Sequence, residues 1–263
     1  IMSSRFDGKH CLVTGAAGGI GSSVVKQLAN EGAKLTLVDL DISALEKLGE
    51  ELRAETSISD SHILIKEADV SQASEVSDYI DASIANHGPI DCFHNNAAIE
   101  GPVSLIEEHS VEDFDRVVAV NIRGVWLGLK FAIPHFASRG GSIVITSSVA
   151  GTIGSPGQSA YVTSKTAVIG IMRTACLELA ERNIRVNTVH PGMVDTGMAR
   201  RIAQQTELGE DGFVDWVTAT IPLRRYATPN DVSSMVCYLF SDEASYCNGS
   251  EFFVDGGIRV GNG

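Results

Sequence analysis

Basic residues, cysteine and long apolar runs are all scarce in this sequence, and each shortage excludes a class of function. The 263 residues include 20 Lys and Arg against 33 Asp and Glu, which gives a formal net charge of −13 and a pI near 4.9. Such an excess of negative charge repels phosphate backbones and anionic lipid surfaces. We therefore expect no nucleic acid and no membrane among the partners.

The number and spacing of the cysteines indicate a reducing compartment. There are five, an odd number, and none has the spacing of metal ligands, so free thiols are expected rather than disulfides or a metal site. Apolar runs such as 143–145 are far too short to span a membrane, and no signal peptide is visible. These features together predict a cytoplasmic protein.

The order of apolar runs indicates an α/β fold. Hydrophobic residues make up 44% and charged residues 20%, as in an ordinary globular protein, and the length suits one large domain. Helical stretches alternate with strand-like runs, which we place at 9–13, 34–38, 62–66, 91–94, 142–145, 185–189 and 251–254. This alternation predicts right-handed βαβ units and a parallel sheet with helices on both faces.

A glycine-rich turn follows the first strand. It reads Thr14-Gly15-Ala16-Ala17-Gly18-Gly19-Ile20-Gly21 and leads into a helical stretch that ends near Asn30. Glycines let a pyrophosphate approach the backbone, and the free N–H groups of a helix N-terminus bind its charge. A purely structural tight turn is the alternative. Its position at the first strand-to-helix junction favours a dinucleotide site.

The second strand ends in an acid that bears on the choice of cofactor. Asp39 lies eighteen residues after Gly21. A carboxylate at this place accepts hydrogen bonds from both ribose hydroxyls and repels a 2′-phosphate, and the turn offers no Lys or Arg to neutralise such a phosphate. NAD is therefore expected rather than NADP. The alternative for Asp39 is a cap or turn acid before the helix that starts near Ile42.

A pair that could transfer protons lies further along the chain. Tyr161 and Lys165 are four residues apart, so they share one face if the segment from Ala160 is helical. A phenol works near neutral pH only if its pKa, about 10, is lowered, and a neighbouring ammonium lowers it. Ser148 precedes the tyrosine by thirteen residues. The pair alone could be a coincidence of helix composition, so its context decides.

The context of the Tyr161–Lys165 pair is a series of further motifs along the chain. The chain resembles the short-chain dehydrogenase/reductase family over nearly its whole length in Thr14-Gly15-x-x-x-Gly19-Ile20-Gly21, Asp69, Asn95-Asn96-Ala97, Asn121, Ser148, Tyr161-x-x-x-Lys165 and Pro191-Gly192. The resemblance implies one doubly wound, Rossmann-type domain over 1–263 with a seven-stranded parallel sheet, and a homotetramer or homodimer. The apolar helical stretch 111–136 has more apolar surface than one buried stripe needs, which also suggests a second subunit.

The resemblance also implies roles for the catalytic residues. Tyr161 is the general acid/base, Lys165 binds the nicotinamide ribose and lowers the pKa of the tyrosine, Ser148 holds the substrate oxygen, and Asn121 supports a proton relay. A mid-helix Asn is, taken alone, more typical of a polar group bonded to backbone. The expected contacts to NAD are Gly15, Gly19, Ile20, Gly21, Asp39, Asp69, Val70, Asn95, Ala97, Tyr161, Lys165, Pro191, Gly192, Val194 and Thr196.

The substrate side is less defined by the sequence. The segment 193–222 mixes apolar and charged residues and is interpreted as a lid or as a simple surface pair of helices. Candidate pocket residues are Ala98, Gln158, Met193, Met198, Ile202 and Trp216. Ala98 stands where the family commonly has glycine. His94 and His190 replace smaller or apolar residues and are interpreted as hydrogen-bonded strand-end histidines rather than metal ligands.

These features predict an NAD-dependent oxidoreductase that interconverts a secondary alcohol and a ketone. The apolar lid without a basic cluster suggests a neutral, moderately lipophilic substrate that is cyclic, aromatic or steroid-like. The alternative is a 3-hydroxyacyl-CoA or 3-oxoacyl thioester, although Asp39 and the charge of −13 argue against a carrier-protein reductase. A catalytically inactive, NAD(H)-binding regulator is a third hypothesis.

Overall fold

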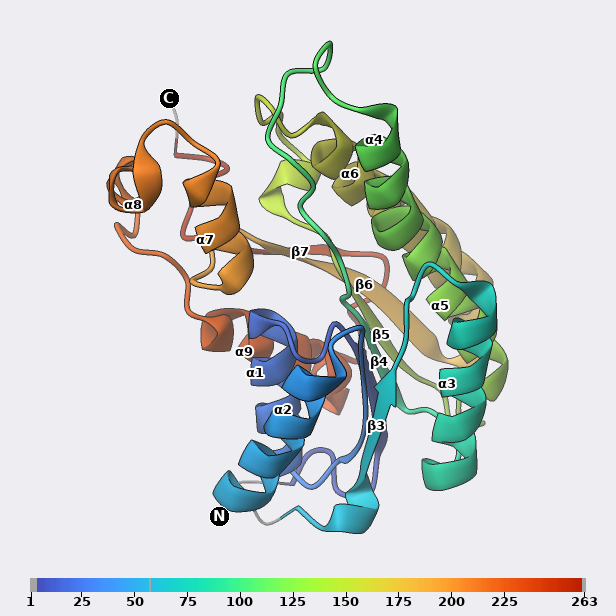
Figure 1. Ribbon diagram of the computed structural model, residues 1–263. Helices are drawn as coiled ribbons and strands as arrows, with labels where there is room; N and C mark the ends of the chain where they lie inside the picture. The colour runs from blue at the N-terminus through green and yellow to red at the C-terminus, as the bar shows by residue number, and fades with distance from the viewer. Residues whose placement is uncertain (1–3, 57, 262–263) are drawn as a thin grey trace.

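The computed structural model describes residues 4–56 and 58–261 and confirms the predicted fold class. Seven parallel strands form one sheet in the order β3-β2-β1-β4-β5-β6-β7 (Figure 1). The strands are β1 (His10–Thr14), β2 (Lys34–Asp39), β3 (Ile63–Glu67), β4 (Cys92–Asn95), β5 (Gly141–Thr146), β6 (Ile184–Pro191) and β7 (Glu251–Val254). The helices are α1 (Gly19–Asn30), α2 (Ile42–Glu55), α3 (Ala73–His87), α4 (Val111–Val118), α5 (Val125–Ala132), α6 (Ser159–Glu178), α7 (Gly197–Gln204), α8 (Gly209–Thr220) and α9 (Pro229–Phe240).

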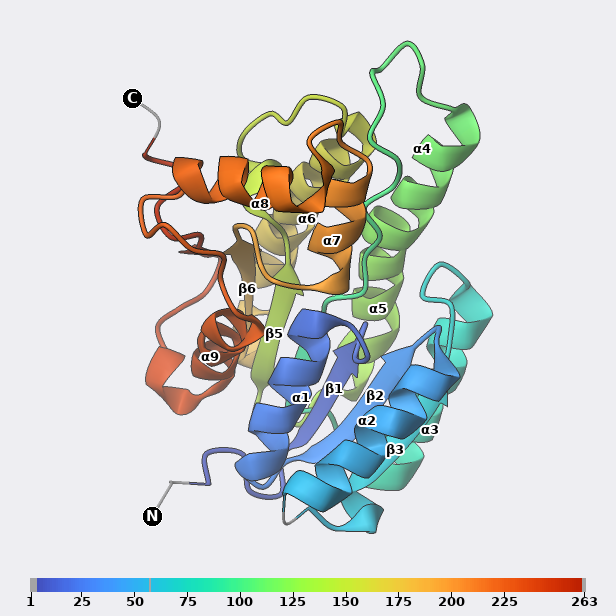
Figure 2. The ribbon, with the colours of Figure 1, turned by 60° about the vertical axis from the view of Figure 1, so that its left-hand side comes forward.

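The strands separate two hydrophobic cores because successive side chains point to opposite faces of the sheet. Cys11 and Val13 of β1 pack with α1, α2 and α9, whereas Leu12 between them packs with α3, α5 and α6. Figure 2 shows α1, α2 and α9 on the near face of the sheet. Burial on both faces explains why the central strands read as continuous apolar runs rather than as alternating ones.

The sheet order places a ligand site at one edge. The chain leaves β1 toward β2 on one side and returns to β4 on the other, so Val13 is paired with Leu37 and with His94. A crevice forms where the connections diverge, outside the carboxyl ends of the strands. The glycine-rich turn follows β1 at this edge, and Asp39 and Asn95 end β2 and β4 there.

The long helix expected over 111–136 has a break in its regular geometry. Six residues of π-helix, Ala119–Gly124, join α4 to α5, and Asn121 lies within them. Among the described residues this stretch, 111–135, has the length and mean hydropathy (1.4) of a membrane span, but 44% of its most apolar window is buried in the domain. It packs against α3 and α6, as a helix that covers a sheet does.

The segment 193–222 forms two helices. α7 and α8 pack against each other around a small core of Ala203, Phe213, Val217 and Ile221, which is separate from the two main cores. Figure 2 shows α8 lying across α7 above the strand ends. The sequence left open a lid or a surface helical pair, and the structure shows a helical pair.

Candidate functional site

The glycine-rich turn is folded tightly against its neighbours. Gly15 has a φ of +64°, and a Cβ there would lie 2.9 Å from Cα of Ala97 on the β4 side. A Cβ on Gly21 would lie 2.1 Å from the Gly15 carbonyl oxygen. Gly18 caps α1 without a side-chain hydrogen bond, and the first turn of α1 contains no acidic residue. The N–H groups at this end of α1 are therefore suited to an anion such as a pyrophosphate.

Asp39 lies beside this turn rather than on the helix that follows. Its Oδ2 accepts a hydrogen bond from the Ala17 amide at 3.0 Å, and its Oδ1 accepts one from the Leu40 amide at 2.8 Å. The cap of α2 is Asp41, whose Oδ1 accepts from the Ala44 amide at 3.0 Å. The alternative that Asp39 caps this helix is therefore wrong, whereas Asp39 is a turn acid in the sense that its Oδ1 also accepts from the Asp41 amide at 3.3 Å. Its half-buried carboxylate is held at the tip of β2.

Several other residues expected to contact the cofactor lie at strand ends. The side chain of Thr196, which caps α7, lies 2.5 Å from where a Gly19 Cβ would be, so the segment after β6 covers the glycine-rich turn. Gly192 at the end of β6 donates its amide to Val254. Asp69 accepts from the Ser71 amide at the end of β3, and Val70 beside it is buried.

The two asparagines at the end of β4 have different hydrogen-bond partners. The side chain of Asn95, expected near the cofactor, instead donates to the Val125 carbonyl oxygen at 2.8 Å and is buried. Asn96, to which the sequence assigned no role, donates to the carbonyl oxygens of Thr14 and Gly15 at 3.1 and 3.2 Å. Asn96 thus ties β4 to the glycine-rich turn. The feature of the sequence that could have indicated this role is a polar residue directly after the end of a predicted strand.

Tyr161 and Lys165 lie on one face of α6, as predicted. The Lys165 Nζ lies 5.6 Å from the centre of the Tyr161 ring and donates to the Thr146 carbonyl oxygen at 2.8 Å. Ser148 follows β5, its Oγ accepts from the Ala150 amide, and its side chain can hydrogen-bond to the Tyr161 phenolate. Serine, tyrosine and lysine therefore meet at the carboxyl end of β5.

Asn121 is held firmly by backbone groups. Its Oδ1 accepts from the Ile99 amide at 2.9 Å, and its Nδ2 donates to the Ile99 carbonyl oxygen at 2.8 Å and to the Ser164 Oγ at 3.0 Å. Ser164 in turn donates to the Tyr161 carbonyl oxygen. The side chain thus fixes the segment after β4 and reaches Tyr161 through Ser164. π-helical turns such as the one around Asn121 occur often at functional sites.

The protein's own groups keep the tyrosine protonated. Burial raises the pKa of Tyr161 to about 12, whereas a hydrogen bond donated by Ser148 to the phenolate lowers it and the Glu100 carboxylate raises it. Burial also lowers the pKa of Lys165 to about 8. The lowering expected from Lys165 together with a cationic cofactor is therefore not supplied by the protein's own groups, among which desolvation has the largest effect. An additional positive charge is needed to favour the phenolate.

The lysine makes fold stability depend on pH. A pKa lowered from 10.5 to about 8 corresponds to about 3 kcal/mol of preference for the neutral amine in the folded state. Below pH 8 Lys165 is protonated in both the folded and the unfolded state, so the folded state bears the full cost of burying its charge. Between pH 8 and 10.5 the folded state releases the proton first, so stability rises over this window. We expect urea denaturation to show the parent gaining about 3 kcal/mol relative to Lys165→Met over that window, and a constant difference would contradict this assignment.

The two unusual histidines are buried below the site. His190 is hydrogen-bonded through Nδ1 to the Ser148 carbonyl oxygen at 3.0 Å and through Nε2 to the Thr188 hydroxyl at 2.8 Å. His94 contacts the Thr146 hydroxyl through Nε2 at 2.8 Å, while its Nδ1 has no partner among the described residues. The interpretation as hydrogen-bonded core histidines is therefore confirmed for His190 and half met for His94. Within 4–56 and 58–261, no cluster of three His, Cys, Asp or Glu side chains suits a metal.

The candidate substrate residues are not gathered in one cavity. Met193 and Ile202 pack against the small core of the helical pair, and Gln158 accepts a hydrogen bond from the Ser155 hydroxyl. Trp216 is 58% exposed and its ring lies 5.9 Å from that of Phe213. Met198 and Ala98 are half-buried.

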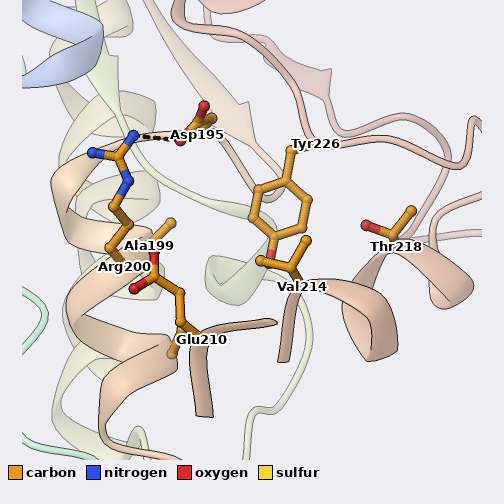
Figure 3. Close-up of a pocket in the computed structure, with 8 residues that line it drawn as sticks. Asp195, Ala199, Arg200, Glu210, Val214, Thr218 and Tyr226 are labelled. Carbon is orange, nitrogen blue, oxygen red and sulfur yellow. Dashed lines mark hydrogen bonds and ion pairs between the residues drawn. The ribbon is translucent and has the colours of Figure 1, made fainter. Parts of the chain in front are cut away.

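Two hollows flank the helical pair. One of about 250 Å³, which we call the outer hollow, is lined by Asp195, Ala199, Arg200, Ala203, Glu210, Val214, Thr218 and Tyr226 (Figure 3). Another of about 210 Å³ is bordered by Met193, by residues of the segment between α8 and α9, by Asp231 of α9 and by residues 253–256 at the end of β7. Neither is lined by Tyr161, Ser148 or Lys165, and among the candidate pocket residues only Met193 borders one of them.

Comparisons with known proteins agree with this geometry. A family model described as "Enoyl-(Acyl carrier protein) reductase" matches residues 15–259. The chain is 35% identical to 3-oxoacyl-[acyl-carrier-protein] reductase FabG of Thermotoga maritima, over 97% of this chain and 100% of that protein. It is 33% identical to cyclohexanol dehydrogenase of Acinetobacter sp. (strain SE19), over 97% of both chains.

Solved structures are similar over the same length. A crystal structure of levodione reductase superposes with a TM-score of 0.91 at 33% identity, covering 98% of this chain and 100% of that one. A crystal structure of NAD+-bound xylitol dehydrogenase gives a TM-score of 0.89 at 32% identity, covering 96% of this chain and 99% of that one. The likeness therefore extends over the site as well as over the sheet.

Proposed function

This chain belongs to the short-chain dehydrogenase/reductase family of NAD(P)-dependent oxidoreductases, and from that premise we propose that it interconverts a secondary alcohol and a ketone with NAD(H). The observation that carries the proposal is the meeting of Ser148, Tyr161 and Lys165 at the end of β5, beside the strand ends that border the glycine-rich turn.

The residues present fit a dinucleotide. The N-terminus of α1 suits the pyrophosphate, the Asp39 carboxylate suits the adenosine ribose, and Lys165 suits the nicotinamide ribose. When bound, NAD supplies hydride acceptance and a positive charge. That charge is what the pKa of Tyr161 requires, since the protein's own groups raise it.

The chain's own residues handle the proton. The Ser148 hydroxyl and the Tyr161 Oη hold the oxygen of the alcohol, and Tyr161 Oη takes its proton during oxidation. In ketone reduction the same Oη returns the proton to the oxygen. Lys165, fixed by the Thr146 carbonyl oxygen, stays close to the tyrosine ring throughout. Asn121 keeps the wall after β4 in place.

Two observations favour NAD over NADP. The Asp39 carboxylate is held beside the turn, where it repels a 2′-phosphate, and the turn has no cationic side chain. The structural neighbour xylitol dehydrogenase is described as NAD+-bound. The preference is tested by the cofactor comparison given in the Discussion.

We propose a neutral cyclic or steroid-like alcohol as the substrate. Relatives named for such substrates include cyclohexanol dehydrogenase, levodione reductase and 3-alpha-(or 20-beta)-hydroxysteroid dehydrogenase of Mycobacterium tuberculosis. The second candidate is a 3-hydroxyacyl or 3-oxoacyl thioester, which the similarity to FabG favours. A panel of cyclic alcohols, hydroxysteroids and 3-hydroxyacyl-CoA esters, each with NAD+ and followed by NADH absorbance, distinguishes the two classes.

We also propose a homotetramer or homodimer whose contact includes the α4–α5 face. Val111, Phe114 and Trp126 there are 69%, 39% and 51% exposed. Apolar side chains gathered on one helix face mark an interaction surface. We further propose a cytoplasmic location, which the five scattered cysteines favour, and no nucleic acid or membrane partner, because the net charge is −13.

Light scattering tests the assembly. We expect the parent chain at a multiple of 27.9 kDa and Trp126→Glu at a smaller multiple, because a buried charge weakens an apolar contact. Trp216→Glu is the matched control, since this tryptophan is equally exposed but lies on α8. A monomeric parent chain would contradict the proposal.

A further inference from the structure

α7 is fastened to the segment between β4 and α4. The Arg201 guanidinium donates from Nε to the Glu100 Oε1 at 2.5 Å and from Nη2 to Oε2 at 3.2 Å. One turn further along the same face, the Gln205 Oε1 accepts from the Val103 amide at 2.9 Å. We refer to Glu100, Val103, Arg201 and Gln205 as the clasp.

The same segment is fastened on its other side to the loop that precedes Tyr161. The Ser104 amide donates to the Gly157 carbonyl oxygen at 2.9 Å. A Cβ on Gly157, whose φ is +77°, would lie 2.8 Å from a Val103 methyl carbon. The segment after β4 therefore joins α7 to the loop before the catalytic helix, and the clasp is the half of this bridge that a movement of α7 would open.

Burial makes the ion pair of the clasp more than a surface contact. The Glu100 side chain is 10% exposed, whereas that of Arg201 is 59% exposed. A nearly buried carboxylate that loses its partner is strongly unfavourable, so the guanidinium holds α7 where it lies. Glu100 is also close enough to Tyr161 to affect its pKa. The ion pair thus joins α7 to a carboxylate whose charge raises the pKa of the catalytic tyrosine.

We propose that Glu100 and Arg201 are positioning residues that hold α7 against the segment between β4 and α4, which also contacts the loop before Tyr161, and that the closed clasp selects alcohols small enough to lie wholly within it. This inference rests on the proposed function, whose substrate class it sharpens. An acyl thioester carries a long arm that must leave the cleft, and an arm that passes between α7 and the segment after β4 keeps the clasp open. A cyclic alcohol leaves it intact.

The test compares neighbouring arginines of α7. Arg201→Ala removes the clasp ion pair, and Arg200→Ala is the matched control, because Arg200 is equally exposed and pairs with Asp195 on the side of the outer hollow (Figure 3). With a cyclic alcohol we expect Arg201→Ala to raise KM about tenfold with little change in kcat, the mark of lost binding rather than lost chemistry. With a 3-hydroxyacyl-CoA, kcat/KM is expected to stay the same or rise.

A second readout does not depend on turnover. Chymotrypsin cleavage within 197–220 is expected to be several-fold faster for Arg201→Ala than for the parent, and unchanged for Arg200→Ala. Arg201→Lys keeps the cation and is expected to recover most of the KM and of the resistance to cleavage. Equal cleavage and equal KM for the two alanine variants would overturn the clasp. Faster cleavage of Arg201→Ala, without turnover by any variant, would support the clasp and overturn the proposed function.

Discussion

Tyr161→Phe is expected to lower turnover by about two orders of magnitude or more, because the substrate oxygen loses its general acid/base. NADH binding is expected to stay nearly intact, since the ring and its contact with Lys165 at 5.6 Å remain. Steady-state turnover and a fluorescence titration of NADH on the same preparation measure the two effects. Near-normal turnover would remove Tyr161 from the proposed chemistry.

Tyr226→Phe is the matched control for that experiment. Tyr226 lines the outer hollow, and its buried hydroxyl has no hydrogen-bond partner among the described residues (Figure 3). Removing it takes away the same atom without breaking a hydrogen bond. Turnover close to that of the parent is expected. The pair of variants thus separates the chemistry of one hydroxyl from a general sensitivity to the loss of a tyrosine oxygen.

Asp39→Ala is expected to reduce the preference for NAD over NADP by about a hundredfold, since hydrogen bonds to a charged group contribute about 1.5–3 kcal/mol each and the repulsion of a 2′-phosphate also disappears. The ratio of kcat/KM for the two cofactors measures it. The neighbouring acid provides a control. Asp41→Ala removes the cap of α2 and should cost about 1 kcal/mol of stability without changing the ratio. A parent enzyme that prefers NADP would contradict the role of Asp39.

The fold was predictable because its signals are local. The alternation of apolar runs with helical stretches and the glycines after the first strand each describe a few consecutive residues, and all seven strands lie where they were expected to within a few residues. The spacing of Tyr161 and Lys165 is likewise a property of one helix. The central strands in particular are easy to recognise as continuous apolar runs, because the sheet buries both of their faces.

Features that depend on distant segments were not predictable. The ion pair between Glu100 and Arg201 joins residues 101 positions apart, and nothing in either neighbourhood indicates it. The raised pKa of Tyr161 follows from burial, which outweighs the hydrogen bond from Ser148. Two acids close together, Asp39 and Asp41, both suit a helix cap, and only the backbone path shows that Asp41 is the cap. Sequence patterns identify such groups but not their surroundings.

The most direct test of the account follows the hydrogen itself. A cyclic secondary alcohol deuterated at the carbinol carbon is incubated with the enzyme and NAD+, and the reduced cofactor is analysed by mass spectrometry. The account predicts NADH that carries the deuterium, formed by the parent enzyme and scarcely at all by Tyr161→Phe. Unlabelled NADH, or tight NADH binding without any reduction of NAD+ across cyclic alcohols, hydroxysteroids and acyl thioesters, would contradict it.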